Sequence, residues 1–499
     1  MRITLVQLCA FGLSAFSASV TAATSCERLG TVPLDHAVVT DARLIPEGPG
    51  EALPFPGSTP PMLPAHCRVQ LDLKPTSDSL IKMELWLPPA EKWNGKFMGA
   101  GNGGFAGSIQ GTRSGMPDAL QRGYATAGTD TGHQGPGGKW AIGHPEKMID
   151  FAYRSTHEMT LKAKQLVQAF YDKPPQRSYF SSCSTGGRMA VMEAQRYPED
   201  YDGIVAGALA NRHIRMWAAG IASSVELLEH PEGALSEEQA GLVNDLVAKK
   251  CDVRNEGFLN DPRQCKVDFA VLRCAAGQSG NTCLTDPQLK TVATFYEGVR
   301  NPKGELIFSG APLSRPISAS STRPDGANGL FDLVRIARND ASLDWKTFDV
   351  ERDVPLLDQK LGFVDAVNPD LEKFKARGGK LLLYHGWADP AITAKNTIRY
   401  YESVLEKMGP EQGDWVRLFM VPGMGHCRGG PGLNGFDSTR AIEQWVEHGV
   451  VPKQLEGRGA NGLTRPLCPY PQWAEYAGKG DLKDGRNWSC KGTAPKGKP

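Results

Sequence analysis

Two dipeptides, Cys183-Ser184 and His426-Cys427, place a cysteine next to a residue that can take part in acyl-transfer chemistry. A disulfide holds its two Cα atoms about 4.4–6.8 Å apart. If Cys183 and Cys427 are bonded, a nucleophile and a general base meet in one site, although 244 positions (427 − 183) separate the cysteines. The two dipeptides therefore favour a hydrolase whose site is assembled from distant parts of the chain.

The first residues of the chain predict an export signal. Met1-Arg2 supplies a positive charge, a mostly apolar run extends from Ile3 to Phe16, and Val20-Thr21-Ala22 has the small residues of a cleavage site. We therefore assign residues 1–23 to a signal peptide and expect a secreted or periplasmic protein. The formal net charge of +1 gives no reason to expect nucleic acid or an anionic membrane as partner. The sequence leaves the oligomeric state open.

The chain has 11 cysteines, and cleavage of the signal would remove Cys9. The cysteines that remain form an even number, which in an exported protein predicts that all of them are paired in disulfides. Closeness in the sequence favours the pairs Cys251–Cys265, Cys274–Cys283 and Cys468–Cys490. Spacing alone does not decide how the others pair, which are Cys26, Cys67, Cys183 and Cys427.

The pattern of apolar residues changes twice along the chain. Residues 93–208 alternate short apolar strands with helices, which implies right-handed crossovers and a mostly parallel sheet. Residues 209–369 break this alternation with clustered cysteines and with segments rich in Pro, Gly and Ser. The alternation resumes within residues 370–490. We therefore predict an α/β core in two parts, 24–208 and 370–490, a large inserted and disulfide-braced lid over 209–369, and a disordered tail over 491–499.

The elements of the core can be placed individually. A helix over 156–171 has its apolar residues mostly on one face. The predicted strands are 96–98, 123–127, 178–181, 202–207, 380–385 and 416–421, and the further predicted helices are 187–196 and 437–448.

Ser184 lies between a predicted strand and a predicted helix, within Ser182-Cys183-Ser184-Thr185-Gly186-Gly187. This order is typical of a nucleophile elbow, a sharp strand-to-helix turn whose strained backbone requires small neighbours. Gly186 and Gly187 meet that requirement on one side, whereas Ser182 replaces the glycine that is usual on the other side. The alternative interpretation is a serine that caps the following helix.

Asp389 and His426 each follow a predicted strand. With Ser184 they give the chain order Ser, Asp, His, which is the order of the α/β-hydrolases. In this scheme His426 takes the proton from Ser184 and later protonates the leaving alcohol, while Asp389 orients the imidazole and stabilises its charge. The alternatives are an aspartate that caps a turn before a proline, and a histidine in an ordinary loop.

An oxyanion hole needs two N–H groups that point at the developing negative charge. We expect one from Thr185, which follows the nucleophile, and the other from Gly103 or Gly104 in the glycine-rich run after the first core strand. The alternative is an ordinary flexible loop. Although the run has glycines spaced as in a dinucleotide-binding loop, no acidic residue at the right distance completes such a motif.

Three blocks together resemble the tannase/feruloyl esterase family, which also includes mono(2-hydroxyethyl) terephthalate hydrolase. They are Cys183-Ser184-Thr185-Gly186-Gly187-Arg188, Gly386-Trp387-Ala388-Asp389-Pro390 and Gly423-Met424-Gly425-His426-Cys427. The resemblance covers nearly the whole mature chain. It implies an α/β-hydrolase core with a lid inserted after the strand at Ile204–Ala206. It also implies a disulfide between Cys183 and Cys427 beside the triad, and another between Cys26 and Cys67.

Lids of this family usually carry a structural calcium ion just after the first lid cysteine. The resemblance therefore implies a site in residues 251–262, with Asp252, Asn255, Glu256 and Phe258 as candidate ligands. Carboxyl and carbonyl oxygens suit calcium, but Asn255 and Glu256 stand where aspartates are expected, and the loop is shorter than in the family. A structural calcium ion is thus an open expectation, and no cofactor is expected for catalysis.

The sequence predicts a serine carboxylic-ester hydrolase that cleaves esters of aromatic acids, such as feruloyl, other hydroxycinnamoyl or galloyl esters, through an acyl-enzyme. Its substrates would be small-molecule or polysaccharide-linked aromatic esters. Thr185 stands where the terephthalate hydrolase has a glutamate, so hydrolysis of terephthalate esters is the less favoured alternative. A catalytically inactive binding module, and acyl transfer to an acceptor other than water, are the alternatives of other classes.

Overall fold

The computed structural model describes residues 25–51, 59–109, 115–278, 280–324 and 327–493. The predicted signal peptide and residues 494–499 of the predicted tail lie outside these ranges. Strand β18 (Trp488–Lys491) includes the first residue of that predicted tail. Within the described ranges, no helix combines the length and the apolar character needed to cross a membrane.

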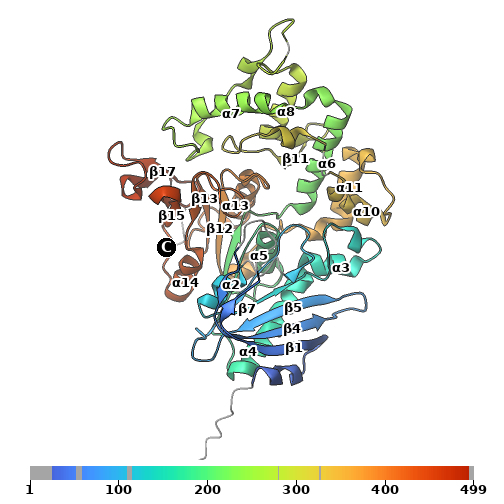
Figure 1. Ribbon diagram of the computed structural model, residues 1–499, viewed down its shortest axis with the longest axis vertical. Coiled ribbons are helices and arrows are strands. Elements are labelled where there is room, and N and C mark those ends of the chain that lie inside the picture. The colour runs from blue at the N-terminus through green and yellow to red at the C-terminus, as the bar shows by residue number, and fades with distance from the viewer. Residues whose placement is uncertain (1–24, 52–58, 110–114, 279, 325–326, 494–499) are drawn as a thin grey trace, which may run out of the picture.

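A nine-stranded sheet runs through the centre of the molecule (Figure 1). Three strands at one edge pair antiparallel with one another and with β7, and the remaining strands pair in parallel. The predicted, mostly parallel sheet is therefore confirmed. From edge to edge the strands are β1 (Ala37–Ile45), β4 (His66–Leu73), β5 (Ile81–Leu87), β7 (Ala125–Thr129), β6 (Lys96–Gly99), β8 (Arg177–Cys183), β9 (Gly203–Gly207), β12 (Lys380–Gly386) and β13 (Val416–Val421).

Helices cover both faces of this sheet. Successive side chains of a strand point to opposite faces, so that Leu381 and Leu383 of β12 pack into one hydrophobic core and Leu382 into the other. Because both faces are covered, β9 is apolar along its whole length and β12 has three consecutive leucines, as is usual in parallel sheets. The first face carries α4 (Ser155–Tyr171), α5 (Thr185–Arg196) and α13 (Ala394–Met408), and the second carries α2 (Met116–Gln121) and α14 (Ser438–His448).

The segment between β9 and β12 lies outside the sheet and forms the lid (Figure 1). Two of its helices begin at capping boxes, in which Ser236 or Thr285 pairs with a glutamine. The disulfides Cys251–Cys265 and Cys274–Cys283 brace it, which confirms the predicted disulfide-braced insertion. Its α-helices and strands are α6 (His213–Glu229), α7 (Glu237–Cys251), α8 (Asp286–Glu297), β10 (Gly298–Arg300), β11 (Leu306–Ser309), α9 (Ala327–Leu330), α10 (Asp332–Arg338) and α11 (Val350–Leu361), whereas α12 (Glu372–Ala376) packs Phe374 into the core of the sheet.

Disulfides also attach the two ends of the described chain. Cys26–Cys67 joins the N-terminal segment to β4, and Cys468–Cys490 joins two short antiparallel sheets beside β13. The sequence had not predicted the strands of these two sheets, which are β14 (Leu433–Gly435), β15 (Leu455–Gly459), β16 (Thr464–Leu467), β17 (Trp473–Tyr476) and β18. The remaining strands and α-helix are β2 (Gly48–Pro49), β3 (Met62–Leu63) and α3 (Pro145–Ile149).

Candidate active site

Ser184 occupies the turn between β8 and α5, since β8 ends at Cys183 and α5 begins at Thr185. Its backbone has φ 67° and ψ −127°, a conformation that residues with a Cβ rarely adopt. The chain holds Ser184 in place, because its N–H donates to the Gly207 carbonyl at the end of β9. Strain held at a strand-to-helix turn in this way is the geometry of a nucleophile elbow.

Glycines let the elbow pack closely against its surroundings. A Cβ at Gly186 would lie 2.0 Å from the Ser182 hydroxyl oxygen, and one at Gly187 would lie 2.3 Å from the Gly207 carbonyl oxygen. A Cβ at Gly101, in the glycine-rich loop after β6, would lie 2.7 Å from the Cα of Gly186. A serine can therefore occupy position 182 because position 186 has no side chain. The glycine-rich loop lies directly against the elbow.

The disulfide Cys183–Cys427 connects the elbow to the loop that follows β13, with 5.9 Å between the two Cα atoms. Ser184 and His426 are the direct neighbours of these cysteines. Asp389 follows β12, which pairs in parallel with both β9 and β13. The fold therefore brings the three residues to the carboxyl ends of neighbouring strands, the edge at which open α/β sheets hold their sites.

His426 and Asp389 are joined by a hydrogen bond. The Nδ1 atom of His426 lies 2.8 Å from Asp389 Oδ2. The aspartate side chain is fully buried, whereas the imidazole is 28% exposed. Because the carboxylate can only accept, the hydrogen lies on Nδ1, and Nε2 is left as the acceptor for a serine hydroxyl.

His385, at the end of β12, is a second imidazole on the same carboxylate. Its Nε2 lies 3.1 Å from Asp389 Oδ2 and 3.1 Å from the Ile392 carbonyl oxygen, and its Nδ1 lies 2.7 Å from Thr397 Oγ1. Both neighbours of Nε2 are acceptors, so Nε2 carries the hydrogen and the Thr397 hydroxyl donates to Nδ1. Sequence reasoning missed this residue. The available signal was a histidine four positions ahead of the aspartate, where a buried strand ends.

Asp389 is surrounded by hydrogen-bond donors. Its Oδ1 accepts from the N–H groups of Ala391 and Ile392, at 2.8 and 2.9 Å, and its Oδ2 faces the two imidazoles. Burial disfavours the charged carboxylate. The hydrogen bonds from His385 and His426 outweigh burial and hold the pKa of Asp389 well below its ordinary value. The carboxylate is therefore charged throughout the neutral pH range.

The three residues predicted for an oxyanion hole lie together beside Ser184. The Thr185 hydroxyl donates to the Gly104 carbonyl at 2.7 Å, which ties the glycine-rich loop to the elbow. Thr185 is the first residue of α5, so its N–H has no acceptor inside the helix. Gly103 and Gly104 are exposed, and the space beside their Cα atoms is open.

Aromatic side chains of the core and the lid meet at this same loop. Phe105 follows Gly104, and its ring lies edge-on to Trp217 of α6, with 4.2 Å between centroids. His213, at the start of α6, lies 5.8 Å from Phe105 and is buried. The first lid helix is therefore packed against the loop that lies beside the elbow.

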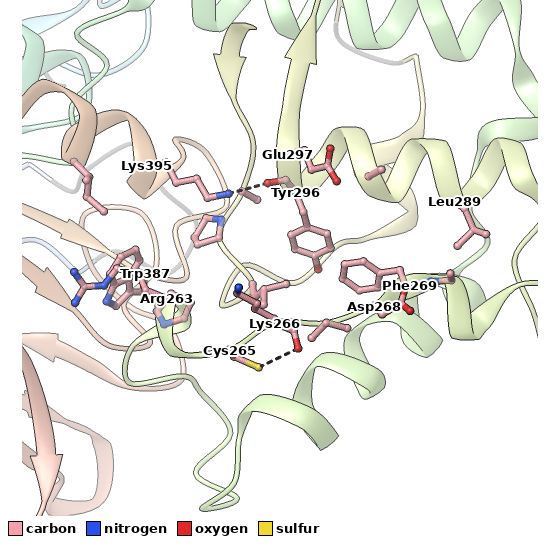
Figure 2. Close-up of a pocket in the computed structure, with 18 of the residues that line it drawn as sticks. Arg263, Cys265, Lys266, Asp268, Phe269, Leu289, Tyr296, Glu297, Trp387 and Lys395 are labelled. Carbon is pink, nitrogen blue, oxygen red and sulfur yellow. Dashed lines mark hydrogen bonds between the residues drawn. The ribbon is translucent and has the colours of Figure 1, made fainter. Parts of the chain in front are cut away.

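A cavity of about 620 Å³ lies between the lid and the core. Figure 2 shows Tyr296 and Phe269 from the lid on one side and Trp387 from the core on another, with Lys395 donating to the Tyr296 carbonyl at 2.8 Å. Trp387 lies two positions ahead of Asp389, but neither Ser184 nor His426 lines this space. The cavity is therefore a neighbour of the candidate active site and not its centre.

The candidate calcium ligands lie in the loop after α7. The Asp252 carboxylate accepts from the N–H groups of Glu256 and Gly257, at 3.0 and 2.7 Å. Glu256 Oε1 lies 2.7 Å from the guanidinium of Arg465. Asn255 is exposed and Phe258 is buried. Because the carboxylates already have donors and a cationic side chain adjoins them, these residues do not fit a calcium site.

Comparisons with known proteins agree with this architecture. A family model described as tannase and feruloyl esterase matches residues 67–491. An uncharacterized esterase of Xanthomonas campestris pv. campestris is 34% identical over 98% of this chain and 95% of its own. A probable feruloyl esterase B-2 of Aspergillus terreus is 33% identical over 85% of this chain and 86% of its own. The crystal structure of feruloyl esterase B from Aspergillus oryzae matches with a TM-score of 0.84 and 30% identity, over 93% of this chain and 99% of that one.

The sheet, the covering helices and the inserted lid define an α/β-hydrolase. The chain belongs to the tannase and feruloyl esterase family, whose model spans most of its length. It is accordingly a carboxylic ester hydrolase of the feruloyl esterase or tannase type.

Proposed function

We propose that this protein is an exported serine esterase that hydrolyses esters of aromatic acids, with Ser184, His426 and Asp389 as its catalytic triad. The observation that carries the proposal is the strained elbow at Ser184, joined by Cys183–Cys427 to a histidine whose Nδ1 already bonds a buried carboxylate. The disulfides support export, because such bonds persist in oxidising compartments.

In the first half-reaction, Nε2 of His426 removes the proton from the Ser184 hydroxyl as its oxygen attacks the ester carbonyl. The tetrahedral oxyanion is held by the N–H of Thr185 and by an N–H of Gly103 or Gly104. His426 then protonates the leaving alcohol, and an acyl group remains on Ser184. In the second half-reaction, His426 activates a water that releases the aromatic acid.

Asp389 and His385 act on the imidazole in different ways. Asp389 fixes the Nδ1–H tautomer of His426 and stabilises its positive charge after proton transfer. His385 donates to the same oxygen of Asp389 and is anchored by Thr397. We assign His385 as a positioning residue, since it holds the carboxylate without touching the substrate.

The surroundings of the elbow support an aromatic acyl group. Phe105 and Trp217 bring two aromatic rings to the loop beside Ser184, and aromatic pairs favour edge-on and stacked partners. Relatives named feruloyl esterase support the same substrate class. The alternative of terephthalate esters has less support, because Thr185 occupies the position after the nucleophile.

Hydrolysis of four esters by the purified mature protein tests the proposal: methyl ferulate, methyl gallate, mono(2-hydroxyethyl) terephthalate and p-nitrophenyl acetate. We expect turnover of the ferulate or the gallate, abolished in Ser184→Ala. Turnover of the terephthalate ester alone would select the alternative substrate class. Folded protein that hydrolyses none of the esters would contradict the proposal and favour a binding module.

A further inference from the structure

A buried arginine of the C-terminal region contacts the lid loop in which the family resemblance implies calcium. Arg465 lies on β16, and its side chain is completely buried. Its guanidinium donates to Glu256 Oε1 at 2.7 Å, to the Leu482 carbonyl at 3.1 Å and to Asn260 Oδ1. The guanidinium also lies over the ring of Trp488, 3.6 Å from its centroid. The side chain of Arg465, from the C-terminal region, thus binds the side chains of both Glu256 and Asn260 in the lid loop.

The polar side chains of the loop are occupied by internal donors. Glu256 Oε2 accepts from the Asn260 amide at 2.7 Å, while Glu256 Oε1 faces Arg465. The two oxygens of Asp252 accept backbone N–H groups of the loop itself. A calcium ion requires about six to eight oxygen ligands, and a guanidinium at the same carboxylate would repel a divalent cation.

We propose that the Arg465 guanidinium takes the place of a calcium ion in this lid, as a permanent internal cation that fixes the loop 252–260 to the core. An arginine can do this because it stays charged and offers several donors in a fixed plane. The inference concerns the lid and is independent of the proposed reaction.

The loop 252–260 packs against the core through the side chain of Phe258. Phe258 packs with Met424 and Leu433 in the same hydrophobic cluster. A Cβ at Gly423 would lie 2.8 Å from the Phe258 ring, so this ring fills the space beside the loop that leads to His426. The internal cation therefore anchors a lid segment that contacts the histidine loop.

Thermal unfolding of the mature protein, measured after dialysis against a chelator and after addition of calcium chloride, tests this proposal. We expect the same Tm in both conditions. Arg465→Met should lower the Tm by several degrees whether or not calcium is present, because Glu256 loses its buried partner. The matched control is Arg458→Met on the neighbouring strand β15, where Arg458 and Glu456 are 72% and 64% exposed, and it should leave the Tm unchanged.

A Tm of the wild-type protein that rises with calcium or falls with the chelator would overturn the proposal, and this measurement needs no variant. An Arg465→Met protein as stable as Arg458→Met would overturn it as well. If Arg465→Met does not fold, Glu256→Gln provides the second variant, since it keeps the shape of the side chain and removes its charge. An unchanged Tm in Glu256→Gln would contradict the proposal.

Discussion

Asp389 and Glu256 are two buried carboxylates that differ in the partners they keep. Asp389 accepts hydrogen bonds from the imidazoles of His426 and His385. Glu256 faces the guanidinium of Arg465, which remains charged at any physiological pH. The first carboxylate can therefore orient an imidazole and stabilise its positive charge, whereas the second holds two parts of the chain together.

The difference shows how one side-chain type serves chemistry or structure according to its partner. At Asp389, one carboxylate oxygen is satisfied by backbone N–H groups, so the other is free to orient an imidazole. At Glu256, both oxygens are committed to Arg465 and Asn260. A change at the first site should alter the rate, and a change at the second should alter stability.

Asp389→Asn should have the largest effect on turnover. The amide would offer an N–H group or a neutral oxygen to His426, which favours the wrong tautomer and leaves the imidazolium without its counter-charge. We expect kcat to fall by about 10³- to 10⁴-fold with little change in Tm. Steady-state kinetics and thermal unfolding of the same preparation check this. A loss of kcat below tenfold would contradict the comparison, because Asp389 would then have no catalytic role to distinguish it from Glu256.

Removal of the Cys183–Cys427 disulfide should have the second-largest effect on turnover. In the Cys183→Ala, Cys427→Ala double variant, the histidine loop loses its covalent link to the elbow, and we expect kcat to fall by about 100-fold from misplacement alone. The matched control removes Cys251–Cys265 in the lid loop, which closes a loop of separation 14 compared with 244. That control should lower Tm and leave kcat within a few-fold. Equal losses of kcat in the two variants would contradict a special role for Cys183–Cys427.

His385→Leu should have a smaller effect on the rate. Asp389 would keep three of its donors, yet Oδ2 would lose the one that fixes it, so we expect kcat to fall about 10-fold with KM unchanged. His385→Gln restores a donor and should recover part of the loss. His66→Gln, a substitution of a buried histidine in β4, controls for the general cost of altering the core. A KM effect alone, or no recovery with glutamine, would remove the positioning role.

Asp365 extends the comparison to a carboxylate that accepts from a backbone N–H, with arginines acting on it only through their charge. Burial raises its pKa to about 7, although the Ile214 N–H and the charges of Arg188 and Arg212 lower it. The folded pKa exceeds that of the unfolded chain, so wild-type stability falls as pH rises from about 4 to about 7. Asp365→Asn should lose this slope and gain about 1–3 kcal/mol relative to wild type across that window. Urea unfolding of both proteins at pH 4 and pH 8 checks this. A difference in unfolding free energy between Asp365→Asn and wild type that is the same at the two pH values would contradict the assignment.

The sequence predicted the parts of the site that depend on local pattern. Ser184, Asp389 and His426 could be placed because each follows a short apolar strand, and the carboxyl ends of parallel strands meet at one edge of a sheet. The helix after Ser184 was predicted to begin at Gly187, although α5 begins at Thr185, since the glycines of the elbow are also part of the first helical turn.

What escaped prediction depends on contacts between distant residues. His385 has the burial of an ordinary strand residue, and only the position of the Asp389 side chain gives it a role. Arg465 lies 209 positions from Glu256, so no local pattern connects the two. The antiparallel strand β1 alternates between half-buried and exposed residues and carries a bulge, which makes its apolar pattern weak.

Capture of the acyl-enzyme tests the central claim most directly. The mature protein would be mixed with the p-nitrophenyl ester of an aromatic acid, quenched in acid during turnover, digested and analysed by peptide mass spectrometry. We predict an acyl group on Ser184, within the peptide that also carries Cys183, and no adduct in Ser184→Ala. An acyl group on another residue, or turnover that persists in Ser184→Ala, would contradict the account.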